Sequence, residues 1–204
     1  LGEAMEQIRS FIAIELPDEI RLNLAQIEFR LKSSGLSGVK WVKPDSIHLT
    51  LKFLGNVAID RTDEITGAIE TATRGISPFV LQVKAPGVFP NLRRVQVVWV
   101  GIGGEGDKLN RLQQQIESNL AQLGFAPESR SFTPHLTLAR LSDRASPDER
   151  QRFGQLIADT RFEEAYTVKV GAINLMKSQL TREGAIHRRI SSVELKKPLS
   201  TATS

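Results

Sequence analysis

The tetrapeptide HLTL occurs twice in this chain, at residues 48–51 within SIHLTLKFLG and at residues 135–138 within FTPHLTLARL. The two copies contain two of the three histidines of the 204-residue chain. Successive side chains of a β-strand point to opposite faces, so each copy places its histidine and threonine on one face and its leucines on the other. Each copy therefore predicts a strand that buries two leucines and presents an imidazole beside a hydroxyl.

The segments around the two copies predict an alternation of strands and helices. Apolar residues spaced by three and four and followed by glycine predict helices, whereas shorter apolar runs that end at proline or glycine predict strands. Helices are expected at 18–35, 60–74, 109–124 and 147–158, and strands at 8–17, 79–90, 93–102, 162–176 and 186–195, with a short one within 40–46. Ser146, Pro147 and Glu149 form a capping-box pattern at the start of the last helix.

The order of elements is similar in the two halves of the chain, and each half contributes one HLTL strand. Hairpins between the other strands favour antiparallel pairing over a strictly parallel α/β sheet. We therefore expect an α+β fold in which residues 1–204 form one pseudo-symmetric domain of two lobes, with mainly antiparallel sheets and flanking helices. Residues 1–7 and 196–204 are expected to be flexible ends.

Composition narrows the classes of function. The chain has no cysteine, which excludes disulfides, a thiolate nucleophile and cysteine-ligated metal sites. No apolar run approaches the roughly 20 residues that cross a bilayer, so we expect no membrane partner. The absence of cysteine suits a cytoplasmic protein. The net charge of +4 is compatible with a phosphate-bearing partner. The basic segments 91–94 (NLRR) and 187–189 (HRR) are interpreted as solvated turns.

Two imidazoles and two hydroxyls suit the hydrolysis of a phosphodiester. The ordinary histidine pKa of about 6.5 allows one ring to be neutral and another protonated near neutral pH. A neutral ring can take a proton from water while a protonated ring gives one to the leaving oxygen, and hydroxyls can donate to phosphate oxygens. A 2′,3′-cyclic phosphate fits this chemistry without a metal. A metal site remains the alternative, with His187 and Asp45 as further ligand candidates that no spacing supports.

The residues after each tetrapeptide break the symmetry. Lys52 has the strand parity to share the face of His48, but a solvated lysine is the simpler interpretation. Arg140 has the wrong parity for a regular strand and reaches the histidine face only if the strand ends or bulges there. Its guanidinium would suit a phosphate.

These motifs resemble a known family. RSFIAIELP (9–17), the first HLTL segment and FTPHLTLAR together look like the two-histidine (2H) phosphoesterase superfamily, and within it the RNA 2′,3′-cyclic phosphodiesterases, also called 2′-5′ RNA ligases. The resemblance covers residues 8–195. It implies a bilobal fold whose two motifs face each other across a central groove.

The resemblance also implies roles for the site residues. His48 would protonate the departing 3′ oxygen, His135 would activate water, and Thr50, Thr137 and Arg140 would hold phosphate oxygens. The reaction would need no metal or other cofactor, and would convert a 2′,3′-cyclic phosphate on an RNA end or nucleotide to a 2′-phosphate.

The sequence departs from this family in one place. An aromatic residue, often tyrosine, stands in the family where this chain has His187. Phe11, Phe53 and Trp41 are candidates for stacking on a base, although each is expected in the core. A 2′-5′ RNA ligase, a non-catalytic module that binds RNA ends and a metal-dependent hydrolase remain alternatives, and a monomer is the default expectation.

Overall fold

Both HLTL segments open a β-strand, and each strand begins at its histidine. The computed structural model describes residues 6–161, 166–182 and 184–196. The strands are β1 (Gln7–Glu15), β2 (Val39–Trp41), β3 (His48–Ala58), β4 (Phe79–Phe89), β5 (Val97–Gly104), β6 (His135–Leu141), β7 (Thr167–Val170), β8 (Ala172–Thr181) and β9 (Gly184–Glu194). The helices are α1 (Asp18–Lys32), α2 (Thr62–Thr73), α3 (Gly106–Gln122) and α4 (Pro147–Asp159), with 3₁₀ turns η1 (Pro44–Ser46) and η2 (Ile59–Arg61).

The strands form two antiparallel sheets with one HLTL strand in each. One sheet has the order β3-β1-β8-β9 and the other the order β2-β6-β5-β4-β7. The expected α+β fold with antiparallel sheets is confirmed. The lobes are not the two consecutive halves of the chain, however, because β8 and β9 from its end complete the sheet that β1 and β3 begin. Order along the sequence could not show this exchange.

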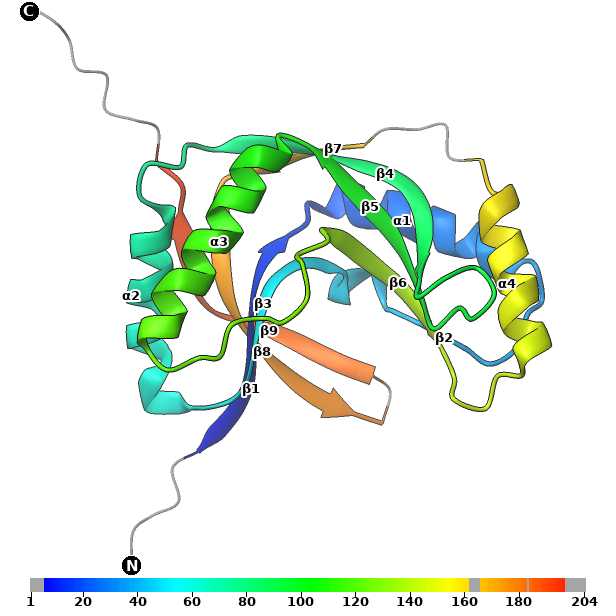
Figure 1. Cartoon of the computed structure of the whole chain (residues 1–204), viewed down its shortest axis with the longest axis horizontal. Helices are drawn as coiled ribbons and strands as arrows, with labels where there is room; N and C mark the ends of the chain where they lie inside the picture. The colour runs from blue at the N-terminus through cyan, green and yellow to red at the C-terminus, as the bar shows by residue number, and fades with distance from the viewer. Residues whose placement is uncertain (1–5, 162–165, 183, 197–204) are drawn as a thin grey trace, which may run out of the picture.

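Helices flank the two sheets at opposite ends of the molecule. Figure 1 shows α2 and α3 together at one end, against the β3-β1-β8-β9 sheet, and α4 at the other end, against the sheet that contains β4. The leucines of both HLTL segments are buried in one contiguous core that is shared by the two sheets: Leu49, Leu51, Leu136 and Leu138. The predicted leucine face is therefore confirmed, and these contacts fix which face of β3 and β6 carries the histidines.

Most predicted elements are present, with shifted boundaries. The capping box of α4 is confirmed, since the Ser146 hydroxyl accepts from the Glu149 N–H and the Glu149 carboxylate accepts from the Ser146 N–H at 2.7 Å. The single strand expected at 162–176 is wrong, because β7 and β8 are separate strands that belong to different sheets. Residues 162–165 of that prediction lie outside the described ranges.

The two basic segments have different outcomes. Residues 91–94 form an exposed connection between β4 and β5, as expected, whereas residues 187–189 lie within β9 rather than in a turn. The expected flexible ends fall mostly outside the described residues, although β1 already begins at Gln7. None of the helices within the described ranges is long and apolar enough to span a bilayer.

The β3-β1-β8-β9 sheet is strongly curled. Its edge strands β3 and β9 would be roughly 14 Å apart across a flat sheet of this order. Instead the rings of His48 on β3 and His187 on β9 have centroids 4.9 Å apart, and the Ser46 hydroxyl donates to the Ala185 carbonyl at 3.2 Å. The curl therefore brings residues from both edges of the sheet together on its concave face.

Candidate active site

His48 lies in a partly buried pocket of aromatic rings. Its imidazole stacks on Phe11, with centroids 4.5 Å apart and planes at 23°, and meets His187 edge-on at 87°. His187 also meets the edge of Phe11 at 5.0 Å, so the three rings contact one another. Burial lowers the pKa of His48 to about 4, and the nearby charges of His187 and Arg21 act in the same direction. A hydrogen bond with the backbone of Ser46 opposes this shift.

His135 lies against a second aromatic wall. Its ring meets Phe89 edge-on, with centroids 5.1 Å apart, and lies 6.2 Å from the ring of Trp99. Its Nδ1 is 2.7 Å from the carbonyl oxygen of Thr133. A carbonyl can only accept, so Nδ1 carries the hydrogen and a neutral ring has its lone pair on Nε2. Because His48 likewise bonds the backbone of Ser46, each histidine is held by the residue two positions before it.

Both HLTL strands bulge at the same position. In β3, Thr50 pairs with Ala13 and Lys52 with Ile12, which leaves Leu51 without a partner in the register. In β6 the register passes from Thr137 to Ala139 and skips Leu138 in the same way. A bulge adds one residue and reverses the alternation of the residues that follow it. The last leucine of each tetrapeptide and the residue after it are therefore both buried.

The two bulges determine which face of its strand each residue after the tetrapeptide occupies. Arg140 is exposed and follows the bulge, which is the condition under which it shares the face of His135 and Thr137. Lys52 does not share the face of His48 and is not solvated, so both interpretations of it are wrong. Its ammonium is buried and lies 2.8 Å from the Glu117 carboxylate and 2.9 Å from the Ala126 carbonyl.

The three residues expected in the core as candidates for base stacking differ in their burial. Phe53 is 60% exposed, with its ring 6.3 Å from that of Phe11, so the bulge places it beside the His48 pocket instead of in the core. Phe11 is buried as expected, although it forms the floor of that pocket. Trp41 packs against the buried Phe153, which agrees with a role in the core.

Several residues near the motifs were missed by sequence reasoning. Glu15 is the cross-strand partner of His48, and its carboxylate accepts from Asn174 and from Arg189, each at 2.6 Å. Phe89 and Trp99 form the wall beside His135. Only the pairing of strands distant in the sequence brings these residues to the motifs, so no local spacing could have identified them.

The alternative of a metal site is not supported by a set of ligands in the described part of the chain. His187 does lie beside His48, but among residues 6–161, 166–182 and 184–196 no three His, Cys, Asp or Glu side chains are grouped so that they could hold a metal ion. Asp45 does not complete such a group.

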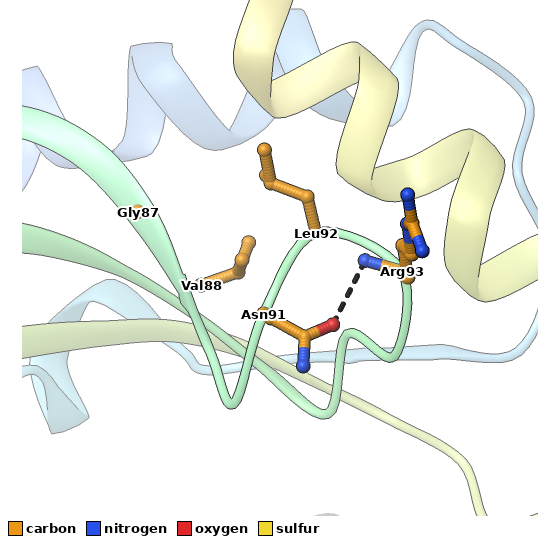
Figure 2. A pocket seen from close by; sticks show the side chains of 5 residues that line it. All are labelled: Gly87, Val88, Asn91, Leu92 and Arg93. Carbon is orange, nitrogen blue, oxygen red and sulfur yellow. Dashed lines mark hydrogen bonds between the residues drawn. The ribbon is translucent and has the colours of Figure 1, made fainter.

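A hollow of about 610 Å³ lies at the connection between β4 and β5, next to α4. Figure 2 shows it with its lining residues Gly87, Val88, Asn91, Leu92 and Arg93, and with the Arg93 N–H donating to the Asn91 side chain at 3.0 Å. None of these residues is a predicted site residue. We assign no role in the reaction to this hollow.

Comparison with known proteins shows the family. The sequence profile of the 2′-5′ RNA ligase superfamily matches residues 16–182. This chain belongs to that superfamily. The RNA 2′,3′-cyclic phosphodiesterase of Methanothermobacter thermautotrophicus is 33% identical over 181 residues, which are 89% of this chain and 95% of the relative. That of Archaeoglobus fulgidus is 32% identical over 187 residues, 92% of this chain and 100% of the relative.

Solved structures of similar proteins have the same fold. Escherichia coli LigT in complex with 3′-AMP superposes with a TM-score of 0.74 at 26% identity, covering 94% of this chain and 100% of LigT. A Thermus thermophilus protein gives a TM-score of 0.74 at 25% identity, covering 92% of this chain and 98% of that protein. The resemblance found in the motifs is confirmed at the level of the superfamily and its fold.

The lowered pKa of His48 predicts that acid destabilises this superfamily member in a defined window. A histidine with an ordinary pKa of 6.5 when unfolded and about 4 when folded takes up its proton first in the unfolded chain. The free energy of unfolding should therefore fall as the pH drops from about 6.5 to 4, by up to about 3–4 kcal/mol from this residue. Burial also lowers the pKa of His187, which adds to the loss.

Urea unfolding at pH values across this window measures the effect. We expect His48→Phe, which keeps a ring on Phe11 but cannot take up a proton, to show a weaker loss of stability in acid than the wild type. An equal loss in the variant and the wild type would contradict the assignment to His48.

Proposed function

We propose that this protein is an RNA 2′,3′-cyclic phosphodiesterase that hydrolyses a terminal 2′,3′-cyclic phosphate to a 2′-phosphate. The observation that carries the proposal is the repeated strand start, in which each HLTL histidine bonds the backbone two residues before it and shares a face with a threonine. β3 and β6 contact each other directly, which supports a reaction that uses the histidines of both strands. Relatives of similar length that are named for this activity give further support.

The proposed reaction is an in-line displacement at phosphorus. A water oxygen attacks the phosphorus while His135 takes up the water proton on Nε2, the atom that its bond to Thr133 leaves free. The bond between phosphorus and the 3′ oxygen breaks, and His48 donates a proton to that oxygen. The products are a 2′-phosphate and a 3′-hydroxyl, and no metal or other cofactor takes part.

His48 needs the substrate in order to act as an acid. With a pKa of about 4 its ring is neutral at neutral pH in the free protein. A nearby anion favours the charged form of an imidazole and raises its pKa. We propose that the phosphate of the bound substrate supplies this anion, so that His48 is protonated mainly in the complex.

Thr50, Thr137 and Arg140 are proposed to hold the phosphate oxygens, with Arg140 as the charged member of the set. Its exposed side chain follows the β6 bulge on the face of His135. Charge-assisted hydrogen bonds contribute about 1.5–3 kcal/mol, so Arg140→Ala should lower kcat/KM by about 10- to 100-fold. Arg140→Lys should recover part of the loss. Steady-state kinetics measure these effects. Arg93→Ala is the control, because Arg93 is an exposed arginine outside the proposed site. Equal values of kcat/KM for Arg140→Ala and the wild type would refute the role of Arg140.

Phe53 is proposed to stack on the base next to the cyclic phosphate. Stacking of a base on an aromatic ring contributes about 1–3 kcal/mol, so Phe53→Ala should raise KM by roughly 5-fold or more with little change in kcat. Phe29→Ala is the matched control, because Phe29 is a 74% exposed phenylalanine on α1, outside both HLTL strands. The role would be excluded if both substitutions had the same effect on KM.

A 2′-5′ RNA ligase uses the same groups with a different nucleophile. A histidine that activates water can also activate a 5′-hydroxyl, so the site is compatible with both reactions. We further propose that the chain acts as one catalytic domain, as a monomer and in the cytoplasm. The contiguous core of the two sheets supports a single domain, and the absence of cysteine is compatible with a reducing compartment.

A short RNA with a 2′,3′-cyclic phosphate, incubated with the protein in excess EDTA, tests the proposed function. We expect the 2′-phosphate to form at a rate that EDTA does not change. A parallel reaction with a second RNA that carries a 5′-hydroxyl measures ligation. Binding of the RNA without any product would indicate the non-catalytic module, and loss of turnover in EDTA would indicate a metal-dependent hydrolase.

A further inference from the structure

We propose that His187 is a positioning residue that acts through His48: the two imidazoles together hold at most one proton, and His48 takes it up when a phosphate anion binds beside it. This inference rests on the proposed function for the role of His48. It concerns a position where the sequence departs from the aromatic residue that the family resemblance implies.

The geometry of the pair carries the argument. The two ring centroids are 4.9 Å apart with planes at 87°, although β3 and β9 are opposite edges of their sheet. Phe11 contacts both rings, stacking on His48 and meeting His187 edge-on. The rings therefore cannot move apart without disturbing a buried phenylalanine.

Ser46 holds the two edges of the sheet together. Its hydroxyl donates to the carbonyl of Ala185, two residues before His187 on β9. Its backbone bonds His48. One residue thus fixes His48 and also ties down the strand that carries His187, so the separation of the two imidazoles is part of the fold.

At this separation, a positive charge on one imidazole disfavours protonation of the other. A second imidazolium about 5 Å away in a partly buried site disfavours protonation of the first by about one pH unit or more. The pair therefore holds at most one proton over the physiological pH range. An anion that binds beside His48 favours protonation there, and His187 then remains neutral.

The other charged groups around the pair do not replace this coupling. Glu15 on β1 is paired with Arg189 of β9 at 2.6 Å, and Asp45 on η1 is exposed. Arg21 on α1 adds a positive charge that disfavours protonation of His48 in the same sense as His187 does. Arg9 on β1 is in register with Ser178, the cross-strand partner of His187, and carries a further positive charge on the face of Phe11. Lys177 on β8 and Arg188 on β9 occupy the alternate register positions, whose side chains point to the other face of the sheet.

His187 also has an unused polar atom at this site. Its Nδ1 is buried and has no hydrogen-bond partner among the described residues. A buried ring nitrogen without a partner is unusual, because burying an unpaired polar group costs free energy. An aromatic side chain without nitrogen would fill the same place without this cost.

The chain has only three histidines, so NMR can follow the titration of each imidazole and assign it with single substitutions. His187→Phe keeps a flat ring against Phe11 but cannot take up a proton. We expect the titration midpoint of His48 to rise by about one pH unit in this variant. Arg188→Gln removes a positive charge from the neighbouring position of β9 on the other face, and should leave the midpoint of His48 unchanged.

The wild-type titration provides a second test that needs no variant. Coupled imidazoles titrate in two steps, each visible in the signals of both rings. Inorganic phosphate should raise the midpoint of His48 and leave His187 neutral. An unchanged His48 midpoint in His187→Phe, independent single-step curves in the wild type, or no effect of phosphate would each overturn the proposal. These titrations need no turnover, so failure of the proposed function would appear separately, as wild-type protein that leaves the cyclic phosphate intact.

Discussion

His48→Ala and His135→Ala are each expected to lower kcat for a 2′,3′-cyclic phosphate by about 10²- to 10⁴-fold, the range for loss of a general acid or base. In the proposed reaction, His48 provides the proton for the departing 3′ oxygen and His135 removes one from the attacking water. Because both proton transfers belong to one displacement, we expect the double variant to lose less than the product of the two single losses. Rates measured under single-turnover conditions, with the products separated, report these losses directly.

His48→Phe separates loss of the proton donor from loss of packing. Phenylalanine can still stack on Phe11, as the wild-type imidazole does with planes at 23°. We expect this variant to be as inactive as His48→Ala while it unfolds at a temperature close to that of the wild type. Activity within a few-fold of wild type in either His48 variant would contradict a role as the acid.

The second large effect concerns stability. Glu117→Leu should lower the free energy of unfolding by about 3–5 kcal/mol, because it leaves the buried ammonium of Lys52 without its counterion. The Lys52 side chain is only 1% exposed, whereas that of Glu117 is 17% exposed and can be solvated by a small movement. Lys52→Met should therefore cost much less than Glu117→Leu, although both remove the same ion pair. Urea unfolding of the two variants measures the difference.

The double variant Lys52→Met, Glu117→Leu completes this test. It replaces the buried pair with apolar side chains, a change that is often neutral or stabilising. We expect its stability to be close to that of the wild type and well above that of Glu117→Leu alone. Equal losses in the two single variants would show that the ammonium is not the group left unsatisfied.

The sequence allowed the main features of the fold and site to be predicted where the signal was local. The alternation in HLTL predicted that Leu49 and Leu136 enter the core, and the spacing of apolar residues predicted the helices. The Ser146 capping box was predicted correctly because it lies within four consecutive residues. The resemblance in the motifs led to the superfamily that the comparisons confirm.

The predictions that were wrong concern features that depend on strand pairing. A bulge is defined by the partner strand, so the sequence of β3 alone could not show that Lys52 turns into the core and Phe53 out of it. The contact between His48 and His187 arises from the curl of a sheet whose edge strands are far apart in the chain. Arg140 was an intermediate case. Its position in the strand showed that a bulge would be needed to place it on the face of His135, but the sequence did not show that a bulge is present.

A bridging sulfur substrate tests the assignment of acid and base most directly. In a cyclic phosphate whose 3′ oxygen is replaced by sulfur, the leaving thiolate is stable without a proton, so the general acid becomes dispensable while the general base does not. We expect His48→Ala to recover most of its activity on this substrate in EDTA, whereas His135→Ala should stay inactive. Recovery by His135→Ala instead, or by neither variant, would contradict the assignment of His48 as the proton donor and His135 as the base.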